Sequence, residues 1–420
     1  MLILMTFLFG LLLVSGSPVY LFLGLPALVV AFFTVPGLMT LASVSISEIQ
    51  NFTMIAVPLF IFVGNLCSRT GMAKIMFQSL NSLLGHLPGG LAIVSLMSST
   101  FFAGITGSSA AETTALGLLL IKPMTEAGYE RKFVTALLAA GGTLGILIPP
   151  SIPMILYGFL VEESVGKLFI AGLLPAAVMV SALTIYSVWY CKKKGYKRGT
   201  KATWRERIRS TITALPIFGM ICIVMGGIYS GITTPTETAA IASVYGILIS
   251  LFIYKNLDWT TFKEVVLETL RLSSMIFLII VGSQLMNFVL IYQRTPMLLT
   301  EYVISQNLSP FLFLLVINII LLILGIPLEP PPLLFMTVPL VAPILGVLGI
   351  DKIHFGIIFV INMQIAICSP PVGVNLYIIS KIADAPNHEI FRSIIPFCII
   401  LLIVLFIVTY IPWLSLVLVR

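Results

Sequence analysis

Long apolar segments dominate this sequence, and several of them, such as Phe169–Tyr190, have the length needed to cross a lipid bilayer. Hydrophobic residues make up 59% of the chain and charged residues only 9%, a composition that soluble domains do not have. The apolar runs are continuous, whereas the strands of an outer-membrane barrel alternate between apolar and polar residues. We therefore predict an all-α polytopic membrane protein.

One basic segment sets the orientation of the chain. Residues 192–209 contain nine Lys or Arg and one Glu, so this segment carries +8, and the rest of the chain carries −1 (7 − 8) of the net charge of +7. A basic run at the foot of a membrane span is more typical of a cytoplasmic anchor than of a nucleic-acid site. We therefore place this segment in the cytoplasm and expect no nucleic-acid partner.

Two apolar regions contain polar, glycine- or proline-rich interruptions, FFAGITGSSAAETTALG at 101–117 and LGIPLEPPP at 324–332. Lipid supplies no partners for free backbone groups, so each interruption must be buried in protein or line a cavity. The arms of the first one, residues 91–103 and 110–121, have about a dozen residues each, where a full span needs about 20. A second short pair flanks the other interruption. Each pair predicts a re-entrant hairpin.

The two hairpins belong to one unit that occurs twice, 221 residues apart. Adding 221 converts Gly104 to Gly325 and converts Pro149-Pro150 to Pro370-Pro371, and each Pro-Pro pair breaks the helix that follows a hairpin. Five predicted crossings, an odd number, separate the two hairpins, so the repeats have inverted topology. Inverted repeats with interruptions at matching positions are typical of the binding site of a secondary transporter.

This organisation predicts five parts. They are scaffold helices over residues 1–88, a first transport-domain repeat over 89–160, scaffold helices over 161–307, a second transport-domain repeat over 308–386, and a C-terminal scaffold helix over 387–420. Residues 257–272 place apolar and charged side chains on opposite faces, which predicts an interfacial helix separate from a span over 275–291. Residues 2–14 and 19–33 form either one bent crossing or two shorter ones.

The interruptions offer the chemistry needed to move an anion with a cation. Helix N-termini present free N–H groups to anions, and free carbonyl and hydroxyl oxygens suit hard cations. Proline cannot donate a hydrogen bond, so Pro149-Pro150 leaves carbonyls one turn earlier without partners. Glu329 falls at the equivalent of Ser108 (108 + 221), where a mid-membrane carboxylate needs a cation or a proton. Glu112, by contrast, is expected to hydrogen-bond a neighbouring helix.

Four ordered motifs resemble the large membrane subunit of a TRAP (tripartite ATP-independent periplasmic) transporter. The motifs are FFAGITGSSAAETTALG at 101–117, GTLGILIPPSIPMILYG at 142–158, GITTPTETAA at 231–240 and GIDKIHFGIIFVINMQIAICSPPVGVNLY at 349–377. The resemblance implies a bacterial inner-membrane protein that imports a carboxylate solute, driven by a sodium gradient, with an elevator-like movement. It also implies a periplasmic substrate-binding protein and a separate small membrane subunit of about four helices as partners.

The resemblance further implies two sodium sites and a substrate site. The first sodium ion would be held by Thr106, Ser108, Gly145, Ile148 and Pro150, and the second by Glu329, Ala366, Ser369 and Pro371. The substrate would lie between the hairpin tips, near Ser108, Ser109, Ser151 and Asn375. Na⁺ is the coupling ion, and no organic cofactor is expected.

Two other functions stay open at this point, and a third is unsupported. A stand-alone cation-coupled anion symporter or antiporter shares hairpins and inverted repeats and works without a binding protein. A channel would conduct without saturable uptake. An intramembrane enzyme has no support, because the sequence contains no HExxH motif and no nucleophile elbow. The carried acid also stays open among C4-dicarboxylates, sialic acid and other carboxylates, because the binding protein selects it.

Overall fold

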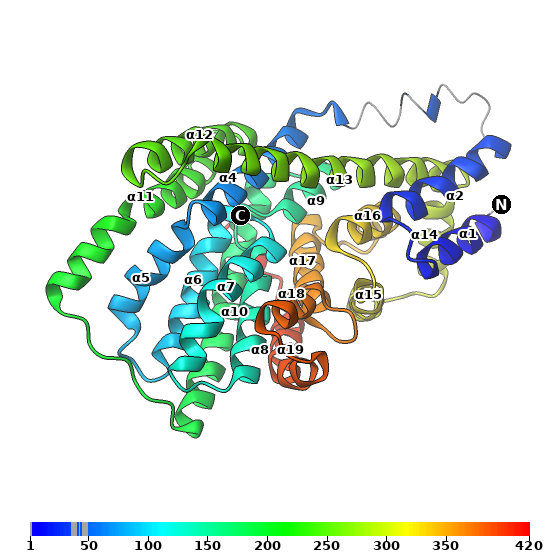
Figure 1. The fold of residues 1–420 in the computed structure, drawn as a ribbon. Coiled ribbons are helices and arrows are strands. Elements are labelled where there is room, and N and C mark those ends of the chain that lie inside the picture. Colours follow the sequence, from blue (N-terminus) through cyan, green and yellow to red (C-terminus); the bar gives the residue numbers. More distant parts are fainter. Residues whose placement is uncertain (1, 35–39, 42, 44–48) are drawn as a thin grey trace.

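The computed structural model describes residues 2–34, 40–41, 43 and 49–420. Every regular element in these ranges is a helix, as the composition predicts. Seven helices in the described ranges are long and apolar enough to cross a membrane. Figure 1 shows the long helix α13 (Trp259–Tyr292) along the upper edge of the bundle, with both hairpins beneath it.

The predicted repeat is confirmed helix by helix. The first hairpin consists of α6 (Gly90–Thr106) and α7 (Ser109–Glu126), and the second consists of α15 (Pro310–Gly325) and α16 (Pro330–Val347). Helices α7 and α16 begin and end 221 residues apart (109 + 221 = 330 and 126 + 221 = 347). The glycines and prolines that recur 221 residues apart in the sequence therefore belong to structurally equivalent segments.

The hairpin arms are longer than the sequence predicts. The first two arms have 17 and 18 residues rather than about a dozen, because polar residues at their ends continue the helix. Thr125 illustrates the reason, since its hydroxyl donates to the carbonyl of Ile121 within the helix. Only Gly107 and Ser108 interrupt the first hairpin, and Gly107 has φ 60°, which ends α6.

Each repeat then continues into a broken helix. In the first repeat, α8 (Arg131–Gly141) passes into the 3₁₀ turn η2 (Gly142–Ile146) before α9 (Ile152–Val161). In the second repeat, α17 (Lys352–Cys368) stays α-helical up to the break before α18 (Val374–Ala383). Both breaks contain a cis Pro-Pro peptide bond. The two breaks thus occur where the sequence predicts them.

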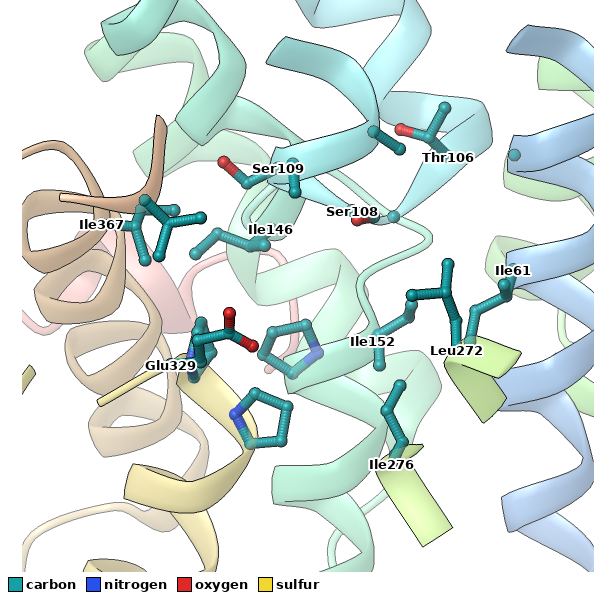
Figure 2. Close-up of a pocket in the computed structure, with 18 of the residues that line it drawn as sticks. Ile61, Thr106, Ser108, Ser109, Ile146, Ile152, Leu272, Ile276, Glu329 and Ile367 are labelled. Atoms are coloured by element: carbon teal, nitrogen blue, oxygen red, sulfur yellow. The ribbon is translucent and has the colours of Figure 1, made fainter. Parts of the chain in front are cut away.

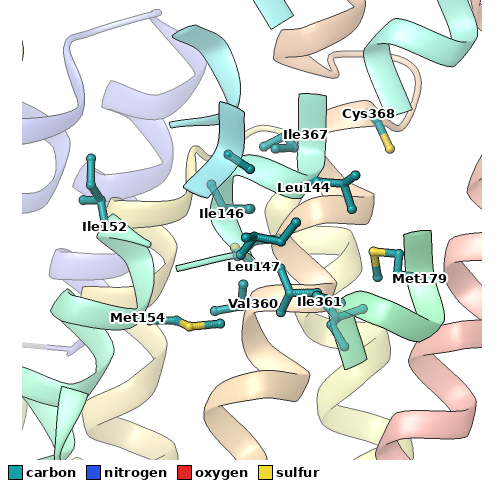
Figure 3. Packing of buried hydrophobic residues seen from close by; sticks show 14 of the residues in the cluster. Leu144, Ile146, Leu147, Ile152, Met154, Met179, Val360, Ile361, Ile367 and Cys368 are labelled. Carbon is teal, nitrogen blue, oxygen red and sulfur yellow. The ribbon is translucent and has the colours of Figure 1, made fainter. Parts of the chain in front are cut away.

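Two further helices pack against the repeats. Helix α10 (Val165–Lys194) contacts α6, α9 and α17, and α19 (Asn387–Tyr410) contacts α8, α17 and α18. Figure 3 shows this core, in which Leu147 and Ile361 from the two broken helices lie near Met179 of α10. All three side chains are fully buried. The hairpins, the broken helices, α10 and α19 therefore share one core.

One prediction about the second half of the scaffold is wrong. The interfacial helix over 257–272 and the span over 275–291 are one continuous 34-residue helix, α13. Helix α4 (Ala56–Arg69) covers the first part of α13, and Asn65 donates to the hydroxyl of Thr269 at 3.2 Å. Arg69 pairs with Glu264 and Glu268 on the charged face of α13. Helix α4 thus packs beside the first part of α13, while the charged face of α13 stays largely exposed.

The beginning of the chain forms two short helices rather than one bent crossing. Helices α1 (Leu2–Val14) and α2 (Val19–Thr34) pack on each other, and α2 also packs along α13 (Figure 1). The remaining elements are the 3₁₀ turn η1 (Phe52–Ile55), α5 (Met72–Leu84), α11 (Trp204–Tyr229), α12 (Pro235–Leu248), the π-helical turn η3 (Ile249–Ile253), α14 (Thr295–Ser305) and α20 (Trp413–Leu416).

The basic segment lies at the same end of the bundle as the start of α8. Lys194 pairs with Glu130, the residue that precedes α8, at 2.7 Å, and Glu130 also pairs with Lys132 at 3.3 Å. Its lysine neighbours hold the pKa of the Glu130 carboxyl below its usual value. The base of the first hairpin therefore faces the side on which the sequence places the cytoplasm.

Candidate functional site

A cavity of about 260 Å³ lies where both hairpin tips and both broken helices meet α4 and α13. Figure 2 shows Thr106, Ser108 and Ser109 from the first tip on one side of it and Glu329 from the second tip on another. Ile276 of α13 lies on the wall that the repeats do not supply. The cavity thus joins the two repeats to the helices that flank them.

The expected site residues divide into two groups. Those that line the cavity are Thr106, Ser108, Ser109, Glu329 and Asn375. Those that do not line it are Gly145, Ile148, Pro150, Ser151, Ala366, Ser369 and Pro371. Most of the second group belongs to the two breaks, behind the hairpin tips.

The first tip contacts the first break closely. A Cβ atom added to Gly145 would lie 3.2 Å from the carbonyl carbon and oxygen of Ser108. A Cβ atom added to Gly107 would lie 2.6 Å from the carbonyl oxygen of Pro150. The structure therefore brings together the tip and the break that were expected to hold the first sodium ion.

The second tip approaches the second break in the same way. A Cβ atom added to Gly325 would lie 2.5 Å from the Cβ atom of Ala366. Near this contact, the hydroxyl of Ser369 donates to the carbonyl of Ile365 at 2.6 Å. Hairpin and break therefore meet in both repeats, as the equivalent positions predict.

The first tip offers hydrogen-bond donors to the cavity. Ser108 is extended (φ −134°, ψ 117°) and precedes α7, and its side chain makes no capping hydrogen bond. The N–H groups in the first turn of an α-helix have no partner within the helix. A helix start with free N–H groups and a free hydroxyl is suited to bind an anion.

The second tip offers acceptors instead. Glu329 immediately precedes α16, and the first three residues of α16 are Pro330, Pro331 and Pro332. Proline is tolerated in a first helical turn, because the N–H it lacks would have no helical partner. The three prolines therefore remove the donors that α7 retains, and a carboxylate lies at the equivalent of Ser108.

Two of the expected substrate residues already have partners. Asn375 donates to the hydroxyl of Ser109 at 2.8 Å and to the carbonyl of Ala139 at 3.1 Å, so it joins α18 to α7 and α8. Ser151 donates to the carbonyl of Ile146 and accepts from the N–H of Met154, which caps α9. Ser151 thus stabilises the break and does not line the cavity.

Helices α4 and α13 contribute a wall of the cavity that the sequence does not predict. Ile61, Gly64 and Asn65 come from α4, and a Cβ atom on Gly64 would lie 3.0 Å from the Cα atom of Thr106. Leu272 and several other apolar residues of α13 complete the wall. The one feature of the sequence that could have indicated this wall is the Gly64-Asn65 pair, which interrupts the apolar run at 54–66.

Inverted repeats with paired hairpins and broken helices, whose two tips bring polar groups to one cavity, define a secondary transporter of the membrane. Residues 5–414 match the family model described as "Tripartite ATP-independent periplasmic transporter, DctM component". The chain belongs to this family and is a large permease component of a TRAP transporter.

Two relatives match over nearly their whole length. The chain is 36% identical to the sialic acid TRAP transporter large permease protein SiaM of Vibrio cholerae, over 97% of this chain and 96% of that protein. It is 38% identical to the C4-dicarboxylate TRAP transporter large permease protein DctM of Pseudomonas aeruginosa, over 93% and 91%. These relatives are transport proteins and not enzymes.

The fold also matches a solved structure. The YdaH transporter of Alcanivorax borkumensis, whose crystal structure is described as having an unusual topology, superposes with a TM-score of 0.67. The match covers 97% of this chain and 98% of that one, at 13% sequence identity. At this identity the match supports the fold alone.

Proposed function

We propose that this permease imports a carboxylate-bearing solute together with Na⁺. The proposal rests mainly on the opposite chemistry of two tips that face one cavity. Free N–H groups at the start of α7 suit a carboxylate, and the carboxylate of Glu329 suits a cation. The relatives named above transport sialic acid and C4-dicarboxylates, which are both carboxylates.

The sodium ions would bind where each tip meets its break. We propose Thr106, Ser108, Gly145, Ile148 and Pro150 for the first ion, and Glu329, Ala366, Ser369 and Pro371 for the second. The close approach of Ser108 to Gly145 supports the first set, and the approach of Gly325 to Ala366 supports the second. Hydroxyl, carbonyl and carboxylate oxygens are suitable ligands for a hard cation.

The movement would be elevator-like, with the two repeats as the mobile part. Helices α10 and α19 each contact both repeats, α10 through α6, α9 and α17 and α19 through α8, α17 and α18, so we propose that they move with them. The proposed mobile part is therefore larger than the one expected from the sequence, in which both helices belong to the scaffold. The stationary scaffold would consist of helices α4, α5, α11, α12 and α13.

The permease would work in the bacterial inner membrane with two partners. A small membrane subunit would pack against the scaffold, and a periplasmic binding protein would deliver the acid. Residues 192–209 would face the cytoplasm.

The test is uptake into proteoliposomes that contain this chain and its small subunit. Candidate acids are added with and without the periplasmic binding protein, and with and without an inward sodium gradient. Uptake that requires both components supports the proposal. Uptake of free acid without the binding protein would instead identify a stand-alone transporter, and non-saturable flux would identify a channel.

Removing one oxygen ligand at each tip should weaken the sodium response. Ser108→Ala and Glu329→Gln are each expected to raise the sodium concentration for half-maximal uptake by roughly tenfold, since a charged or hydrogen-bonded contact contributes about 1–3 kcal/mol. The exposed Ser305→Ala and Glu301→Gln serve as matched controls. Unchanged sodium curves in both tip variants would contradict the assigned sites.

The mobility of α19 can be tested with two native cysteines. The sulfur atoms of Cys368 in α17 and Cys398 in α19 are 4.0 Å apart, and neither is in a disulfide. If α19 moves with α17, joining the two thiols should leave uptake within about twofold of the untreated protein. Cys398→Ala is the control for the oxidant. Loss of uptake in the cross-linked protein, with sodium binding intact, would assign α19 to the scaffold.

A further inference from the structure

Glu112 lies inside the first repeat, one turn after the hairpin tip, and its side chain is completely buried. The sequence predicts that it hydrogen-bonds a neighbouring helix, but neither of its carboxylate oxygens has a hydrogen-bond partner in the described part of the protein. The polar groups that face it are the Ser99 side chain and the Gly145 backbone. Glu112 therefore faces a hydroxyl of the neighbouring helix α6, in the direction that the sequence predicts, but these neighbours do not saturate its two buried oxygens.

Two hydroxyls beside Glu112 also lack partners. Ser99 in α6 and Thr113 in α7 are both buried, and their side-chain oxygens make no hydrogen bond to any described residue. Buried polar atoms in native proteins usually have partners, so three such side chains together indicate an absent ligand.

The three side chains converge on a row of glycines at the end of α8. A Cβ atom on Gly141 would lie 2.8 Å from the Ser99 hydroxyl, and one on Gly142 would overlap the Thr113 hydroxyl. A Cβ atom on Gly145 would lie 2.5 Å from Oε2 of Glu112. The GGTLG sequence thus leaves room on one face for oxygen atoms from α6 and α7.

Ionisation of Glu112 would require a compensating positive charge. A buried ionised carboxylate carries a large free-energy penalty unless a cation neutralises it. The ion pairs among the described residues join Arg69, Lys132, Lys194 and Arg420 to other acids, and none includes Glu112. A carboxylate with two hydroxyls is a suitable ligand set for a small hard cation.

We propose that Glu112, Ser99 and Thr113 form a third Na⁺ site, next to the tip and separate from the two described above. It rests on the proposed sodium coupling and adds one ion to it. Gly145 lies between the two neighbouring sites, because both Glu112 and the Ser108 carbonyl contact the same face of this glycine. Na⁺ in the third site would neutralise Glu112 and hold the start of α7 against the first break.

The test compares sodium coupling in wild type and Glu112→Gln, both with the small subunit in proteoliposomes. The Hill coefficient for sodium and the number of positive charges moved per acid should each fall by about one in the variant. Glu126→Gln, an exposed acid at the end of the same helix, is the matched control and should behave as wild type.

A second measurement follows Na⁺ binding without transport. Sodium titration of the purified complex by calorimetry should show one ion fewer for Glu112→Gln. If that variant does not fold, Ser99→Ala and Thr113→Val should each weaken sodium binding by roughly three- to tenfold, as loss of one oxygen ligand predicts. Thr114→Val is their control, because Thr114 is exposed and its hydroxyl bonds only within α7.

The outcomes separate this inference from the proposed function. A sodium-dependent wild type with an unchanged Hill coefficient and ion count in Glu112→Gln overturns the third site and leaves sodium coupling standing. A changed pH profile with an unchanged sodium count also overturns it, because Glu112 would then carry a proton. A wild type without any sodium response overturns both.

Discussion

Replacing Gly145 by alanine is expected to reduce acid uptake by roughly ten- to a hundredfold, because overpacking a closed site costs about 1–3 kcal/mol. The added methyl group would lie 2.5 Å from the Glu112 carboxylate and 3.2 Å from the backbone of Ser108. The carboxylate can swing away, but the backbone of the tip has to shift. Both cation sites beside the first tip would be disturbed by this one change.

The measurement is sodium-driven uptake together with the thermal stability of the purified complex. Gly346→Ala is the matched control, because no atom lies within 4 Å of a Cβ at that helical position. We expect Gly145→Ala to lose uptake with only a small change in melting temperature. Equal sodium affinity in Gly145→Ala and wild type would show that the tip and the break do not form a cation site.

The internal repeat was predictable because its markers are local in the sequence. A Pro-Pro pair breaks a helix wherever it occurs, so Pro149-Pro150 and Pro370-Pro371 mark the same point in the two repeats. The 221-residue spacing then relates one repeat to the other. For the same reason, the hairpins and the breaks occur where the sequence places them.

Features that depend on distant packing were not predictable. The two predicted segments of α13 form one continuous helix that packs against α4, and Asn65 and Thr269, which join the two helices, lie 204 residues apart. The surroundings of Glu112 likewise depend on how α6, α7 and the glycines at the end of α8 and in η2 meet. Ser151 was expected near the substrate, but the local turn uses its hydroxyl as a cap.

The two tips also show how a symmetric backbone acquires asymmetric chemistry. Ser108 and Glu329 occupy equivalent positions before α7 and α16, yet only α7 keeps the N–H groups of its first turn. Three prolines remove these donors from α16 without breaking it. An anion would therefore bind nearer the first tip, and the second tip would contribute negative charge.

Replacing Asn375 by leucine is expected to destabilise the protein and abolish most uptake. Asn375 is 1% exposed and is the residue that ties α18 to Ser109 at the first tip and to the Ala139 carbonyl in α8. Leucine fills a similar volume but leaves these two buried groups unpaired, and each unpaired group costs about 1–3 kcal/mol. The tip would lose its attachment to the second repeat.

Thermal unfolding in detergent measures the stability change, and sodium-driven uptake measures the functional loss. Asn81→Leu, at an exposed position, is the control for the substitution itself. Asn375→Asp adds a second comparison, because its carboxylate still accepts from Ser109 but is repelled by the Ala139 carbonyl. If Asn375 mainly positions the tip, both variants should lose uptake at temperatures where they remain folded. Wild-type uptake by the folded leucine variant would show that the first tip needs no support from the second repeat.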